Sequence, residues 1–180
     1  GLTGLVTSVL GMAFGVVCSH IFADGVAETL EGWVTAIFPH SAEYSGGWYL
    51  ASNLGCGAVY TGVFVLFRSV TGIIRNAMEG FSSGLLNSLL GTLFCVANYM
   101  LLLSICYNVL VGMNPESTLM RYGKADDGNI CSAVMLVAPI CLGSESFDEF
   151  VHEYQLREAK KISMNIAGDS TVYDAGALLI

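Results

Sequence analysis

The chain has 180 residues, a net charge of −8, and a charged fraction of only 12% beside a hydrophobic fraction of 54%. Soluble domains carry about 25% charged residues, so this composition favours a membrane protein. The negative charge and the lack of a Lys- or Arg-rich run argue against nucleic acid as a partner, because clustered basic residues bind that polyanion.

The charged residues are unevenly distributed, and this distribution divides the chain. From this pattern we predict a transmembrane bundle at 1–112 and a mostly polar C-terminal tail at 113–180. The chain begins at Gly1 rather than Met, and we expect an upstream segment, of unknown identity, to be missing. The charged residues of the bundle are Asp24, Glu28, Glu31, Glu43, Arg68, Arg75 and Glu79.

Three uncharged apolar runs are long enough to cross a membrane. They cover about 2–23, 49–67 and 85–111. A spanning helix needs about 20 such residues, because the hydrocarbon core is about 30 Å thick. The expected fold is therefore all-α: a polytopic membrane bundle whose helices pack through faces of small residues.

The connection after the first run has an amphipathic pattern over about 26–38. Its apolar residues recur at helical spacing, opposite Glu28 and Glu31, and Pro39 ends the pattern. We expect an interfacial helix here, with an ordinary loop helix as the alternative. The apolar residues are Val26, Leu30, Trp33, Val34 and Ile37.

The segment 69–84 is short, and we expect it to be a tight cytoplasmic connection. Arg68 and Arg75 then serve as cytoplasmic anchors under the positive-inside rule, since the 24–47 connection has acids but no Lys or Arg. Three spans would place the tail outside. Arg121 and Lys124 argue for the opposite orientation.

The tail contains two further candidate helices. The apolar run Ile130–Leu142 includes Pro139 and is too short to span, so we expect it to pack against the bundle or the interface. The stretch 147–162 is acidic at its start and basic near its end, which is typical of a surface helix. We expect little order after Ser163.

Small and amide residues within the runs are the candidates for helix packing or for a narrow pathway. Small residues at four-residue spacing let helix backbones approach closely in a membrane, which favours packing, while the pathway remains the alternative. The candidates are Gly11, Gly15 and Ser19 in the first run, Asn53, Gly55, Gly57 and Gly62 in the second, and Gly91 and Asn98 in the third.

No motif for catalysis, phosphate binding or metal binding is present, and we expect neither an enzyme nor a cofactor. Cys131 and Cys141 match no zinc pattern. If the tail is outside, these two cysteines either form a disulfide or remain free. The remaining cysteines lie in apolar runs: Cys18, Cys56, Cys95 and Cys106.

The run GLLNSLLGTLFCVANYMLL at 84–102 resembles the region around the last span of the colicin V production protein family. The opening GLTGLVTSVLGMAFGVVCSHIFA at 1–23 resembles that family's second span, and the order of elements is similar. Asn87 and Ser88 stand where the family has Asp and Arg. The resemblance implies a bacterial inner-membrane protein that supports toxin (bacteriocin) production or export, or envelope homeostasis.

Two other functions remain open. The chain is alternatively a subunit of an oligomeric small channel or transporter, or a membrane-anchored scaffold that acts through its tail. The partners that we expect are the lipid bilayer and either further copies of the chain or other membrane proteins.

Overall fold

A computed structural model of the chain describes residues 2–39, 46–77, 85–123 and 129–177, with side chains over 4–39, 46–72, 89–123 and 129–166. Every regular element in this part is helical. The helices are α1 (Leu2–Ile37), α3 (Gly46–Ala77), α4 (Leu85–Met113), α5 (Thr118–Gly123), α6 (Ile130–Leu142) and α7 (Phe147–Ala177).

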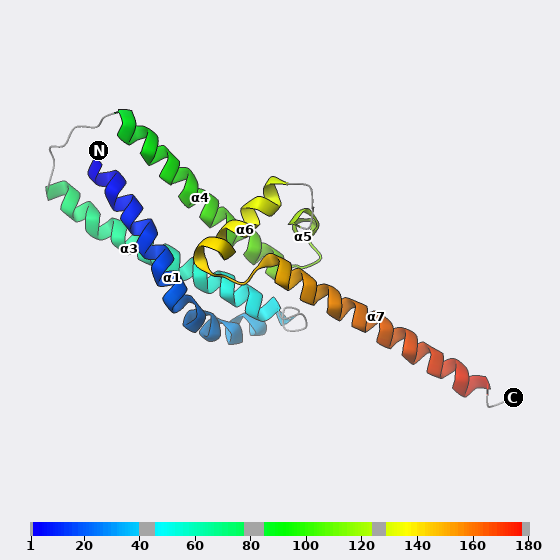
Figure 1. Cartoon of the computed structure of the whole chain (residues 1–180). Coiled ribbons are helices and arrows are strands. Elements are labelled where there is room, and N and C mark those ends of the chain that lie inside the picture. Colours follow the sequence, from blue (N-terminus) through cyan, green and yellow to red (C-terminus); the bar gives the residue numbers. More distant parts are fainter. Residues whose placement is uncertain (1, 40–45, 78–84, 124–128, 178–180) are drawn as a thin grey trace.

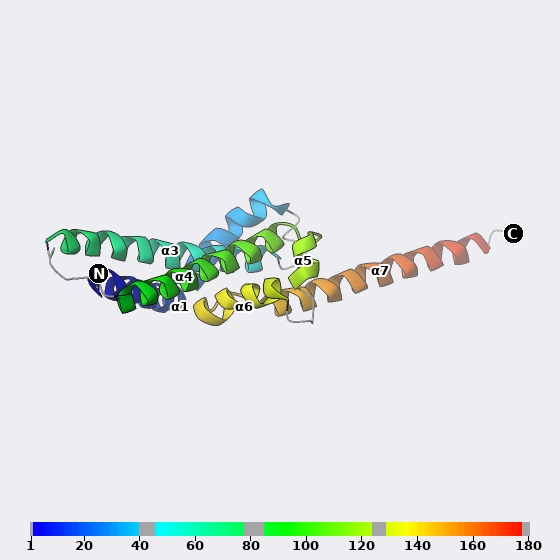
Figure 2. The same ribbon diagram turned by 90° about the horizontal axis from the view of Figure 1, so that it is seen from above.

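Three helices are long and apolar enough to cross a membrane, over Gly4–Ile37, Gly46–Gly72 and Leu89–Met113. The helices α1, α3 and α4 run side by side as a bundle (Figures 1 and 2). The prediction of an all-α, multi-pass membrane bundle is confirmed. The three apolar runs form its three helices because each is uncharged over about the thickness of a hydrocarbon core or more.

The helix α1 does not end where its apolar run ends. It continues without a break to Ile37, so the expected interfacial helix at 26–38 is the second half of α1 rather than a separate element. This half changes direction (Figures 1 and 2). No proline occurs before Pro39, so the amphipathic pattern simply extends the helix.

Two other boundaries also differ from the expectation. The helix α3 continues to Ala77, so most of 69–84 is not a tight connection, and 78–84 lies outside the described residues. The helix α7 continues to Ala177, well past Ser163, where we expected little order. Loss of apolar periodicity marks the end of a buried face, but it does not by itself end a helix.

The helix α6 lies across the bundle, and α7 then leaves it (Figure 1). The two helices are bent by 111° relative to each other. Between them, Gly143 has a φ of 71°, a left-handed conformation that glycine adopts without steric cost. Beyond its first turns, α7 projects past the end of the bundle (Figures 1 and 2).

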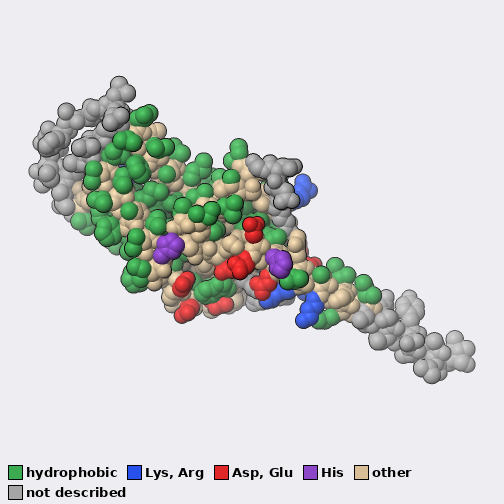
Figure 3. Space-filling model, in the orientation of Figure 1, with side chains coloured by type: hydrophobic (Ala, Val, Ile, Leu, Met, Phe, Trp, Pro, Cys, Tyr) green, Lys and Arg blue, Asp and Glu red, His purple; other side chains and the backbone are tan. Residues whose placement is uncertain are grey.

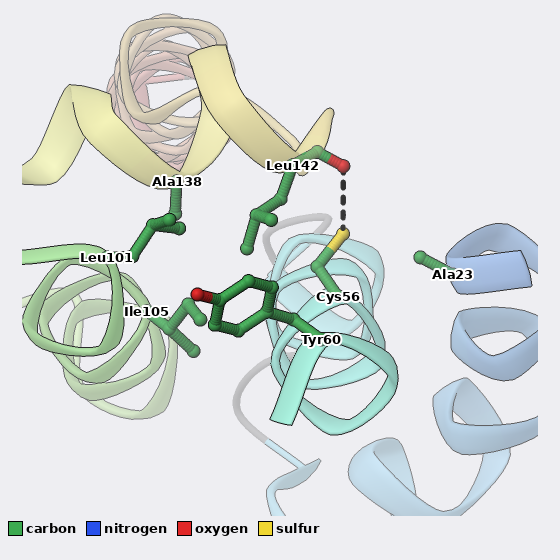
Figure 4. Close-up of a cluster of buried hydrophobic side chains, with 7 residues drawn as sticks. All are labelled: Ala23, Cys56, Tyr60, Leu101, Ile105, Ala138 and Leu142. Atoms are coloured by element: carbon green, nitrogen blue, oxygen red, sulfur yellow. Dashed lines mark hydrogen bonds between the residues drawn. The ribbon is translucent and has the colours of Figure 1, made fainter. Parts of the chain in front are cut away.

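A hydrophobic cluster joins α6 to all three spanning helices. Cys56 and Tyr60 of α3 point toward Leu142 of α6 and Ile105 of α4 (Figure 4). Packing of the short apolar run against the bundle, one of the two sites that we expected for it, is therefore confirmed. The whole cluster is Ala23, Cys56, Tyr60, Leu101, Ile105, Ala138 and Leu142.

Candidate functional site

The buried polar side chains of the described part gather around α6. They come from α1, α3, α4 and the turn after α6, and none of them is more than 7% exposed. We call this set the polar junction. Its members are Ser19, Ser52, Asn53, Ser104, Asn108 and Ser144.

Pro139 explains why α4 carries polar residues here. Within a helix, the nitrogen of residue 139 would donate to the carbonyl of Met135, but proline has no N–H. Asn108 Nδ2 donates to that carbonyl at 2.9 Å, and Ser104 Oγ donates to it at 3.2 Å. Ser104 Oγ also accepts from the backbone nitrogen of Ala138 at 2.8 Å. Two side chains of α4 therefore replace the hydrogen bond that proline removes.

The amide of Asn108 links α6 to α3 and α7. Its Oδ1 accepts a short hydrogen bond from the hydroxyl of Tyr49. The ring of Tyr49 stacks on Phe150 of α7, with centroids 4.3 Å apart. Phe147 is buried against Gly123, where a Cβ would lie 2.6 Å from its ring. The base of α7 is therefore fixed to the same junction.

The C-terminal end of α6 is capped by side chains of α1 and α3. Ser19 Oγ donates to the carbonyl of Leu142 at 3.4 Å, and Cys56 Sγ donates to the same oxygen at 3.8 Å (Figure 4). His20 Nε2 donates to the carbonyl of Cys141 at 3.1 Å. The last carbonyls of a helix have no partner within it, so these contacts satisfy them.

The turn after α6 is held by the start of α3. The backbone nitrogen of Glu145 donates to Ser52 Oγ at 3.0 Å, and Trp48 Nε1 donates to Glu145 Oε2 at 3.1 Å. Burial raises the pKa of the Glu145 carboxyl, the indole hydrogen bond lowers it, and nearby Glu149 and Glu153 raise it further.

Two oxygen atoms of the polar junction have no hydrogen-bond partner. They are Asn53 Oδ1 and Ser144 Oγ, both fully enclosed. Asn53 Nδ2 donates to the carbonyl of Tyr49 at 3.0 Å, so the amide is partnered only on its nitrogen. Buried polar atoms of this kind are uncommon in folded proteins and call for an explanation.

The polar junction lies at the level where the uncharged part of α1 ends. That part, Leu2–Ala23, is about 33 Å long at 1.5 Å per residue, close to the hydrocarbon thickness. Asp24 follows it directly. Acidic side chains gather over the second half of α1 and the start of α7 (Figure 3). The junction therefore stands at an acidic end of the bundle.

The small residues predicted for packing fall into two groups. In the first, a Cβ would meet a neighbouring helix: at Gly55 it would lie 2.9 Å from the Ala23 carbonyl oxygen. At Gly15 it would lie 2.8 Å from the ring of Tyr60, and at Gly11 3.1 Å from Phe67.

Gly57 is equally enclosed, since a Cβ there would lie 2.8 Å from Ile105. Gly62 and Gly91 form the second group, with nothing within 4 Å of an added Cβ.

Of the other predicted residues, Ser19 and Asn53 belong to the polar junction. Asn98 lies apart from it and accepts a hydrogen bond of 2.6 Å from the Tyr60 hydroxyl. Arg68 is exposed and lines a small recess with Thr7, Ser8 and Gly11 of α1. The side chain of Arg75 lies outside the described residues.

Ser52, Ser104, Asn108 and Ser144 are also central, and the site prediction did not include them. Serine is common in apolar runs, so its presence there does not predict a role. Pro139 does predict one, because it leaves the carbonyl of Met135 without its helical donor. A disulfide between Cys131 and Cys141 does not form, because both are free and lie ten residues apart in one helix.

In chemical terms the junction offers hydroxyl and amide groups and helix carbonyls. Among the described residues, no group of three His, Cys, Asp or Glu side chains is placed to hold a metal ion.

The comparisons with known proteins bear mainly on the part before α6. The model of the colicin V production protein family matches residues 1–124. No curated protein matches the chain, and no solved structure matches it.

Proposed function

Since the chain belongs to the colicin V production protein family and is a multi-pass membrane protein involved in colicin V production, we propose that it is a non-enzymatic component of the bacterial inner membrane. In this proposal it supports toxin export or envelope homeostasis by presenting α7 to another membrane or envelope protein.

The projecting part of α7 is the observation that carries the proposal. Its base is buried through Phe147 and Phe150, whereas Leu156, Ile162 and Ile166 are each more than half exposed. A helix that is rigidly based and open along its length suits docking of a partner, because little conformational entropy remains to be lost on binding.

The chemistry of the polar junction also supports a non-enzymatic role. Its hydroxyls and amides mostly serve backbone groups of α6, as Ser104 and Asn108 do for Met135. Such bonds hold helices together in membranes.

Truncation of the projecting helix tests the proposal. A stop after Gln155 removes the exposed part of α7 and retains Phe147, Phe150 and Tyr154. In a producer strain that depends on this chain, we expect secreted colicin V activity to fall to the level of the null strain. Membrane insertion and thermal stability should stay unchanged.

A second variant keeps the full length of the chain and replaces the exposed Leu156 and Ile162 with Ser. This variant should lose most of the same activity, because the apolar face would dock the partner. Full secretion by both the truncated and the substituted chain would refute docking through α7.

The alternative is a subunit of a small oligomeric channel or transporter, favoured by buried polar groups within an otherwise apolar bundle. Purified chain in liposomes distinguishes the two functions. Ion flux that changes with Asn98→Leu would support the channel. Tight liposomes with loss of secretion on truncation support docking.

We further propose that Arg68 and Arg75 mark the cytoplasmic side and that α7 lies outside. Trp48 and Glu145 are hydrogen-bonded, so the start of α3 and the α6–α7 turn share one end of the bundle. A single cysteine at the exposed Ser163, with the native cysteines replaced, should react with a membrane-impermeant maleimide in spheroplasts. Reaction only in inverted vesicles would reverse the orientation.

A further inference from the structure

The two unpartnered oxygens of the polar junction are the starting point. Asn53 is fully buried and Ser144 is 7% exposed, and neither Asn53 Oδ1 nor Ser144 Oγ has a hydrogen-bond partner. Leaving two buried polar atoms unpaired is costly, because neither regains the hydrogen bonds that it made to water in the unfolded chain. A ligand that binds oxygen would remove this cost.

Two bridging contacts bring these residues to the same place. The segment after α6 is bonded to α3 on either side of Asn53, through Leu142 to Cys56 and through Glu145 to Ser52. Ser144 lies between the two bonded residues of its segment, and Asn53 lies between the two of α3. Ser144 therefore lies in a segment that packs against the turn of α3 that carries Asn53.

We propose that this region is a binding site for a small monovalent cation, held by Asn53 Oδ1 and Ser144 Oγ beside the carbonyl end of α6. Hard cations prefer oxygen ligands, and neutral amide, hydroxyl and carbonyl oxygens suit a single charge. The C-terminal end of a helix carries a partial negative charge, and interrupted helices in transporters coordinate sodium through such ends.

The surrounding charges favour a cation over an anion. Glu145 is adjacent to Ser144, and Glu149 and Glu153 lie near it on α7. Asp24 directly follows Ala23, whose carbonyl oxygen would lie 2.9 Å from a Cβ at Gly55 of α3. The group nearby that does not favour a cation is His20. Its Nε2 donates a hydrogen bond to the carbonyl of Cys141, so its ring faces the same end of α6. The site does not depend on the proposed role in export.

Thermal unfolding of the purified full chain in sodium, potassium and choline chloride at equal ionic strength tests the site. A ligand that binds only the folded state raises the melting temperature with its concentration. We expect sodium or potassium to raise it above the value in choline. An equal melting temperature in all three salts would overturn the proposal. It would indicate that the region holds no cation and at most a water molecule.

Ser144→Ala makes the test specific. Without a ligand, removal of an unpaired buried hydroxyl should be neutral or stabilising. With the ligand, the apparent Kd for the cation should rise by about tenfold or more, because even indirect partners of a bound metal contribute ~10–100-fold.

Ser117→Ala is the matched control, since Ser117 Oγ is also buried and unpartnered but lies between α4 and α5. It should respond to the cation as the unchanged chain does. Identical responses of the two serine variants would contradict the site. Asn53→Ala should weaken cation binding in the same way. If the Asn53→Ala chain does not fold, the result for Ser144→Ala alone decides whether the site exists.

Discussion

The contact between α1 and α3 and the contact between α6 and the bundle use opposite means to join helices. Along α1 and α3, glycines let backbones touch, as at Gly55 against Ala23. Around α6, hydroxyls and amides replace backbone bonds that Pro139 and the helix end leave open. A regular helix in a membrane needs only close packing, whereas an interrupted one also needs donors from its neighbours.

The largest expected effect is on the glycine side. Gly55→Ala would place a Cβ 2.9 Å from the Ala23 carbonyl oxygen and 3.1 Å from the Ala27 nitrogen. Both atoms are backbone and cannot rotate away, so we expect a loss of about 3 kcal/mol in the free energy of unfolding, measured by SDS titration in mixed micelles.

Gly62→Ala is the control on the same helix, because nothing lies within 4 Å of its added Cβ. It should be neutral or stabilise by up to about 1 kcal/mol through helix propensity. Equal destabilisation at both positions would show that loss of the contact between the backbones of α1 and α3 is not the cause of the lower stability.

On the polar side we expect a smaller effect, from Asn108→Leu. The change removes the acceptor for the Tyr49 hydroxyl and one of two donors to the Met135 carbonyl. The expected loss is about 2 kcal/mol, most of it the cost of an unpaired buried hydroxyl.

Tyr49→Phe should restore part of that loss in the Asn108→Leu background, because it removes the orphaned group. A double-mutant cycle by the same titration should give a coupling of about 1 kcal/mol. Strict additivity would mean that the hydroxyl and the amide do not act together.

Gly143→Ala should have the next largest effect. This residue tests close approach at a glycine and the polar contacts around α6 together. Its φ of 71° is unfavourable for alanine, and the added Cβ would lie 2.7 Å from His20 Nδ1. We expect a loss of about 1–2 kcal/mol.

His20→Ala should relieve only the contact and leave the strain of the backbone. Complete rescue of Gly143→Ala by His20→Ala in thermal unfolding would show that φ is not limiting. Gly25→Ala, with open space around its Cβ, is the neutral control.

The smallest expected effect is outside both contacts, on α7. Glu153 and Arg157 form an ion pair of 3.3 Å with side chains 48% and 42% exposed. Glu153→Gln should change the free energy of unfolding by less than about 0.5 kcal/mol, as solvent and salt screen such pairs. A larger change would mean that α7 is held along its projecting part as well.

Much of the fold could be predicted from the sequence, because hydrophobic length decides which segments enter a membrane. The run Ile130–Leu142 was predicted to be too short to span, and its limits are those of α6. The extensions of α1 and α3 could not be read in this way. Hydropathy reports where apolar residues stop, whereas a helix stops where backbone bonds or side-chain breakers require it.

The candidate site was predictable only in part. Ser19 stood out through its four-residue spacing with Gly11 and Gly15, and Asn53 because an amide in an apolar run needs hydrogen-bond partners. Ser104 did not, since a serine hydroxyl in a helix can bond to a carbonyl of that helix, as Ser8 does with Gly4, and Ser144 lies in the turn beyond the apolar run Ile130–Leu142. Their role depends on where α6 lies, and that follows from tertiary packing.

The position of α6 has a mechanical consequence. It is bonded to α4 through Met135 and to α1 and α3 through Leu142, so one short helix fastens three long ones at a single level. Any of the three that slid along its axis would break these bonds. In a bilayer of different thickness the bundle should therefore tilt as one body, because adjustment of single helices is blocked.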